Sequence, residues 1–120
     1  MWTDLVGPED ALHLMVEFGA FHDSCIREMH LWTGYSVNAD LAMACPGHLD
    51  TNLRILVQRQ SRSPSAIELL FEQVTRLNFV PYPENHLAII FGATLLRHEA
   101  DWIWSPDSEV WSPGDPARDT

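Results

Sequence analysis

The first apolar pattern along the chain has the spacing of an amphipathic helix. Three apolar residues recur at intervals that place them on one helical face: Leu12, Met15 and Val16. Upstream, Gly7 suits the N-cap and Pro8 the first helical position, and downstream Gly19 suits the left-handed conformation in which many helices end. The pattern therefore predicts one amphipathic helix over about residues 8–18.

Beyond this helix the apolar residues follow the alternating period of β-strands. Strands are predicted where this period holds: residues 25–32, 41–44, 53–58, 67–71, 87–95 and 102–104. In the first of them, Cys25, Met29 and Leu31 share the apolar side. The polar loop 60–65 makes the third and fourth strands a hairpin, and a turn or bulge is expected near Val74 before the chain continues.

The order of the predicted elements indicates the fold class. Both faces of the strand 87–95 are apolar, which favours a central place in its sheet. Helical patterns do not alternate with the strands, so a parallel sheet is not expected. We predict a mainly β (α+β) fold, an antiparallel β-sandwich or a strongly curved sheet, with one N-terminal helix. Residues 1–104 form a single globular domain in this prediction, and residues 105–120 form an acidic, proline-rich C-terminal tail.

The chain is strongly acidic. Seven basic residues, all arginine, stand against seventeen acidic ones, and the formal net charge is −10. A nucleic-acid binder needs a basic surface, and so does a protein that docks on anionic lipid; neither class is expected. The charge is compatible with a basic protein partner, or with solubility and nothing more.

The sequence predicts a cytoplasmic protein. Its first residues lack the basic and long apolar segments of a signal peptide, and no apolar stretch reaches the ~18 residues of a transmembrane helix. Cys25 and Cys45 do not form a CxxC motif. We expect reduced thiols, and a disulfide between them stays open because the sequence does not give their separation.

Histidine and aspartate pairs are the candidates for a metal site. His22 and Asp23 are adjacent, and His48 and Asp50 are two positions apart; these side-chain types bind zinc, usually in sets of three or four. The alternative is structural, with Asp23 accepting backbone N–H groups at a turn. The sequence contains no HExxH, CxxC, GxSxG or phosphate-binding motif, so no catalytic residue and no cofactor are predicted.

Trp102 and Trp104 are the candidate interaction residues. They share one face of the last predicted strand, and Ile103 lies on the other face. If Ile103 faces the core, the two tryptophans form an exposed apolar patch, which usually marks an interface and permits a homodimer. The alternative places both tryptophans in the core.

The order of motifs in the middle of the chain resembles that of a known group of proteins. Phe21-His22-Asp23-Ser24 leads into a strand, and the later strand 66–71 is followed by Val74, by Leu77 and by a final strand pair. Over about residues 18–104 this arrangement resembles the small β-rich immunity-type proteins of bacterial polymorphic-toxin systems and their uncharacterised relatives. The resemblance implies binding rather than catalysis: an acidic protein that masks the active site of a basic toxin. It assigns no binding residue.

The leading hypothesis is therefore a non-enzymatic binding protein, of the immunity type, that masks a basic partner. One alternative is a metal- or histidine-dependent enzyme whose site would use the candidate residues His22, Asp23, His48 or Asp50. The other is a small-molecule-binding domain.

Overall fold

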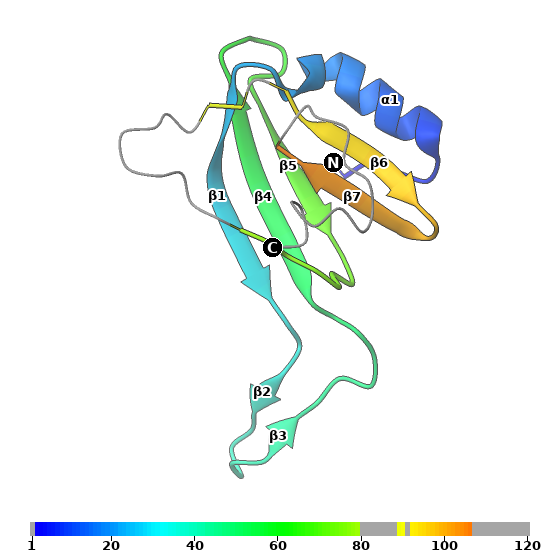
Figure 1. Ribbon diagram of the computed structural model, residues 1–120. Helices are drawn as coiled ribbons and strands as arrows, with labels where there is room; N and C mark the ends of the chain where they lie inside the picture. Colours follow the sequence, from blue (N-terminus) through cyan, green and yellow to red (C-terminus); the bar gives the residue numbers. More distant parts are fainter. Residues whose placement is uncertain (1, 80–88, 91, 107–120) are drawn as a thin grey trace.

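The polypeptide forms one N-terminal helix followed mainly by β-strands (Figure 1). The computed structural model describes residues 2–79, 89–90 and 92–106. In this part of the chain the elements are α1 (Pro8–Glu17), a 3₁₀ turn (Gly19–Phe21), β1 (Ser24–Trp32), β2 (Ser36–Val37), β3 (Met43–Ala44), β4 (Asn52–Arg59), β5 (Ala66–Phe71), β6 (Thr94–His98) and β7 (Asp101–Ser105). The paired strands of these residues are antiparallel, which confirms the predicted mainly β, antiparallel class with one N-terminal helix.

α1 begins where the local sequence satisfies the free N–H groups of a helix start. Gly7 is the N-cap and Pro8 the first helical residue, as predicted. The Asp10 carboxylate reaches back and accepts hydrogen bonds from the backbone N–H groups of Val6 (2.9 Å) and Gly7 (3.0 Å). These bonds, that of Gly7 foremost, lower the pKa of Asp10 because they favour its charged form. Beyond the other end of the helix, Gly19 is left-handed with φ 60°, also as predicted.

The buried face of α1 differs from the predicted one. Leu12 and Val16 are 66% and 73% exposed, and of the three expected residues only Met15 packs against the core. A second set of apolar residues, which also recurs at helical spacing, faces inward instead: Ala11, Leu14, Met15 and Phe18. This set buries the phenyl ring of Phe18, which is larger than any side chain of the predicted face, and so removes more apolar surface from water.

The largest sheet has the order β1–β4–β5, so β4 is its central strand. Leu53, Ile55 and Val57 of β4 are buried, as their alternation predicted. They share one face of the sheet because successive residues of a strand point to opposite sides. β4 and β5 form the predicted hairpin around the loop 60–65, with Leu53 opposite Phe71.

A β-bulge in β1 changes which residues of this strand face the core. The register against β4 shifts between Ile26 and Glu28, so Arg27 is an extra residue. Ile26 and Met29 consequently pack against the core, whereas Leu31 is exposed. The bulge puts Cys25 on the opposite face from Met29, so the prediction that these two residues share a side is wrong. Leu31 keeps the face of Met29, opposite Leu53, but lies at the exposed end of the strand.

The turn expected near Val74 is present one residue earlier, at Gln73, whose φ is 54°. Val74 packs against the core, and its backbone N–H donates to the carbonyl oxygen of Thr51 (2.9 Å). This bond ties the segment after β5 to the start of β4. Leu77 and Phe79, further along, are exposed.

β6 and β7 form a hairpin where the sequence predicted one long strand over residues 87–95 followed by a short one. Ile90 makes two backbone hydrogen bonds with Ser24 (2.7 and 3.3 Å), and a strand begins only at Thr94. Among the described residues this strand pairs with β7 alone, so the predicted central place is wrong for Thr94 and Leu95. The central strand of the three-stranded sheet is β4. Residues 80–88, residue 91 and the tail 107–120 lie outside the described residues.

The core lies between the three-stranded sheet, α1 and the β6–β7 hairpin. Its buried apolar members are Phe18, Phe21, Leu53, Ile55, Val57, Ile90 and Ala93. Phe21 lies edge-to-face with Phe18 (ring centroids 5.0 Å apart) and with Trp104 of β7 (5.6 Å). The guanidinium of Arg97 in β6 donates to the carbonyl oxygen of Val6 (2.6 Å), which holds the hairpin beside the start of α1.

Both cysteines are free thiols. Cys25 lies near the start of β1, and Cys45 follows β3, beyond the other end of β1. At ~3.3 Å per residue, the part of β1 that lies between them is about 23 Å long. The two cysteines do not form a disulfide with each other in this structure. Within the described part of the chain, no helix has both the length and the apolar character that crossing a bilayer requires.

Candidate functional site

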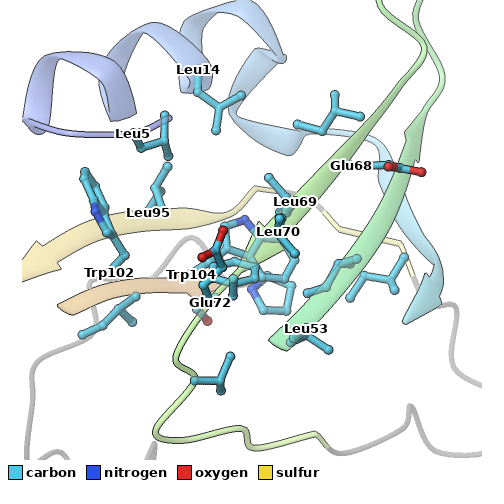
Figure 2. A pocket seen from close by; sticks show the side chains of 18 of the residues that line it. Leu5, Leu14, Leu53, Glu68, Leu69, Leu70, Glu72, Leu95, Trp102 and Trp104 are labelled. Carbon is cyan, nitrogen blue, oxygen red and sulfur yellow. The ribbon is translucent and has the colours of Figure 1, made fainter. Parts of the chain in front are cut away.

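A large cleft opens between the three-stranded sheet and the side formed by α1 and the β6–β7 hairpin. Its volume is about 1930 Å³. Figure 2 shows leucines and tryptophans converging on it from all three sides: Leu5 and Leu14 from α1 and the segment before it, Leu53, Leu69 and Leu70 from the sheet, and Leu95, Trp102 and Trp104 from the hairpin. The cleft is therefore an apolar space bounded by separate elements.

Acidic side chains outnumber arginine around the cleft. Among the described residues, its lining includes Asp4, Asp10, Glu17, Glu68, Glu72 and Asp101, with Arg76 as the lining arginine. Glu68 in β5 and Glu72 just after it are both exposed, and Glu17 ends α1. A cation at the edge of the cleft would meet a local excess of negative charge contributed by the helix and the sheet.

The size of the cleft indicates the kind of ligand it can hold. Pockets for small molecules usually measure about 300–1,000 Å³ and enclose most of the ligand. The cleft, at about 1930 Å³, is larger, so its size matches a segment of polypeptide better than a single metabolite.

The two candidate tryptophans line this cleft, and they do not form a separate surface patch. Trp104 packs against the core cluster and meets Phe21 edge-to-face, as the alternative interpretation of the sequence had it. Trp102 is half-buried, with the guanidinium of Arg97 5.7 Å from its ring centre. Ile103, between them, is also half-buried. Nε1 of Trp104 is buried and has no hydrogen-bond acceptor among the described residues.

The four candidate metal ligands fall into two separate pairs. In the first, His22 Nδ1 lies 3.1 Å from Asp23 Oδ2, and both side chains are well exposed. The second pair, His48 and Asp50, lies beyond the opposite end of β1, because Ser24 and Trp32 mark the two ends of that strand. No group of three or more potential ligands is found in the part of the chain that the structure describes.

Asp50 makes a hydrogen bond that the amino-acid sequence did not suggest. Its Oδ2 accepts a hydrogen bond from the backbone N–H of Gly34 (2.7 Å), which closes the chain between β1 and β4 at their shared end. Gly34 is needed there because a Cβ would overlap Oδ2 of Asp50 and lie 3.1 Å from Cγ of Pro46.

We expect Gly34→Ala to lower the free energy of unfolding by about 1–2 kcal/mol, because the added methyl group forces a well-packed contact apart and displaces Asp50 from its hydrogen bond. Urea unfolding measures the change. Gly47→Ala is the matched control, since nothing lies within 4 Å of a Cβ at Gly47. Equal losses for the two variants would contradict the role given to Gly34.

The segment between β1 and β4, residues 33–51, projects away from the rest of the molecule (Figure 1). We call it the arm. β2 and β3 pair along it, with Ser36 opposite Ala44 and Val37 opposite Met43, and Leu41 at its tip is 85% exposed. From the sequence, only its second strand was predicted, as residues 41–44, and His48 and Asp50 near its base were named as candidate metal ligands.

Sequence reasoning missed both the cleft and the arm. The cleft is assembled from elements far apart in the chain, so no local pattern marks its residues. A local signal did exist for the arm tip, because Asn38 is a residue type that caps turns with its own side chain. Comparison of the chain with protein-family models, with curated proteins and with solved structures gives no match.

Proposed function

We propose that this is a non-enzymatic binding protein whose cleft receives a basic segment of a partner protein. The observation that carries the proposal is the cleft itself, an apolar space of about 1930 Å³ with acidic side chains along its lining. Apolar side chains of the partner would be buried against the leucines and tryptophans. Its lysines or arginines would lie near Glu68 and Glu72.

The overall charge supports a basic partner over an acidic or neutral one. A formal net charge of −10 attracts a basic protein over several ångströms and speeds the encounter. Carboxylates beside the cleft add specificity, because an acidic segment placed there would meet like charge.

The proposed function extends to the surface that is masked, the layers of the fold and the location of the protein. In it the protein masks its partner's basic surface, as the resemblance to immunity-type proteins implies. The three-stranded sheet is one layer of a sandwich, α1 and the hairpin form the other, and the cleft lies between them. A cytoplasmic location, in which Cys25 and Cys45 stay reduced, completes the proposal.

The test uses a short synthetic peptide of alternating leucine and lysine, with its leucine–glutamate analogue as the negative probe. We expect the lysine peptide to bind and to change the fluorescence of Trp102 and Trp104, which line the cleft. Binding should weaken between about 0.1 M and about 1 M salt, because the Debye length falls from ~10 Å to ~3 Å.

Charge variants locate the binding site. Glu68→Gln with Glu72→Gln should weaken the lysine peptide about threefold to tenfold, the value for two exposed ion pairs. Glu9→Gln with Glu28→Gln makes the same change in net charge away from the cleft lining, and should change affinity less than about twofold. Equal binding of both peptides, or equal effects of both double variants, would contradict a specific basic-segment site.

A further inference from the structure

The arm, residues 33–51, is a second surface, and no described residue of it lines the cleft. It carries exposed apolar side chains along both of its strands and at its tip: Tyr35, Val37, Leu41 and Met43. Exposed apolar groups gathered on a projecting element usually mark an interaction site. The arm is therefore a candidate binding surface separate from the cleft.

Hydrogen bonds hold the tip of the arm in one conformation. The Asn38 side-chain Oδ1 accepts from the backbone N–H groups of Asp40 and Ala42, both at 3.0 Å. The backbone of Asn38 also donates to the Ala42 carbonyl oxygen (3.0 Å) and accepts from the N–H of Leu41 (2.9 Å). At the base, the bond between Gly34 and Asp50 fixes where the arm leaves the sheet.

Leu41 occupies an unusual position in this ordered tip. Its φ is 64°, in the left-handed region that branched and bulky residues rarely adopt. Its side chain is 85% exposed, so folding gains almost nothing from burying it. A strained backbone that presents an apolar side chain to solvent is a reason to look for a binding role, because an ordered anchor loses little conformational entropy when it binds.

The charge of the arm indicates the chemistry of its partner. Residues 33–51 contain Asp40 and Asp50 and no lysine or arginine. Asp50 is engaged at the base, so Asp40, exposed next to Leu41, sets the charge at the tip. A pocket that received Leu41 would place basic side chains near Asp40.

We propose that the arm is a docking element that inserts Leu41 into an apolar pocket with a basic rim on a partner protein. A second copy of this chain does not match that chemistry, since each copy carries a net charge of −10 and like charges oppose self-association. The arm has fewer residues than the 20–30 that a partner contributes to an interface of about 800 Å², so Leu41 acts as one anchor in a larger contact.

The test places a photo-reactive phenylalanine analogue at position 41 of the full-length protein in its native cells. After irradiation, mass spectrometry identifies the peptides joined to it. The same analogue at position 12 is the matched control, because Leu12 is also exposed but lies on α1. We expect position 41, and not position 12, to label one protein, at a site that combines apolar residues with lysine or arginine.

The labelled partner is then purified and its affinity measured with two variants. Leu41→Asn removes the apolar group while keeping the turn, since asparagine tolerates the left-handed conformation. It should weaken binding at least tenfold, and Leu12→Asn less than twofold. Labelling of a second copy of this chain, labelling no stronger than at position 12, or a Leu41→Asn variant that binds as tightly as the native protein would each overturn the proposal. Each of these readouts is independent of the cleft variants, so failure here leaves the proposed function to its own test.

Discussion

Replacing Phe21 with alanine is expected to lower the free energy of unfolding by about 3–5 kcal/mol, which is typical of removing a phenyl ring from a core. Phe21 is 0% exposed. Its ring contacts Phe18 just beyond α1 and Trp104 on β7, so one side chain joins the helical end of the molecule to the hairpin. The loss combines the transfer free energy of the ring with the cavity left between those two partners.

Chemical unfolding by urea, followed by circular dichroism, measures this loss. Phe79→Ala is the control because it deletes the same side chain where it is 56% exposed, and we expect it to change stability by no more than about 1 kcal/mol. If Phe21→Ala were as stable as Phe79→Ala, the aromatic cluster would not be the centre of the core.

Features set by local chemistry were predictable from the sequence. The start of α1 depends on Gly7, Pro8 and Asp10, which lie within one helical turn. The Asp10 carboxylate accepts from the backbone N–H of Gly7, and Pro8, the first helical residue, has no N–H that needs a partner. The buried face of β4 follows from the alternation of Leu53 with Ile55, because a strand has only two faces and the neighbouring positions are more polar.

Features set by pairing between distant segments were not predictable. The bulge at Arg27 exists only in the register of β1 against β4, and it places Cys25 and Met29 on opposite faces of the strand. In the same way, α1 offered two overlapping apolar faces. The choice between Leu12 and Phe18 as the inward residue depends on what the sheet and hairpin leave to be filled.

In the candidate binding surfaces, too, locally determined features were predictable and those that depend on distant segments were not. Trp102 and Trp104 were identified from their shared strand face, and both line the cleft. Glu68 and Glu72 also line the cleft, but they come from β5 and the residue after it, and no pattern in the sequence connects these positions with β7. The sequence predicted a strand that begins at Leu41. The left-handed φ of Leu41 could not be predicted from its own side chain, because the hydrogen bonds of Asn38 impose it.

Replacing Trp104 with alanine is expected to cost about 3 kcal/mol, at the lower end for a large aromatic residue because Trp104 is half-buried. Its ring packs edge-to-face against Phe21 in the core and forms part of the cleft wall. Trp104→Phe should cost less than about 1 kcal/mol, since it keeps an aromatic ring and removes an indole N–H that has no acceptor among the described residues and therefore gains nothing from burial.

A double-mutant cycle separates this contact from general loss of packing. Because Phe21 and Trp104 touch, the double alanine variant should be more stable than the sum of the single losses predicts, by about 0.5–3 kcal/mol. Exactly additive losses would mean that the hairpin packs on the core without this contact. The contact also matters for function, because a hairpin held by Trp104 fixes one wall of the cleft. Trp104→Ala should therefore weaken binding of the leucine–lysine peptide even under conditions where the variant is fully folded. Trp104→Phe should leave that binding nearly unchanged.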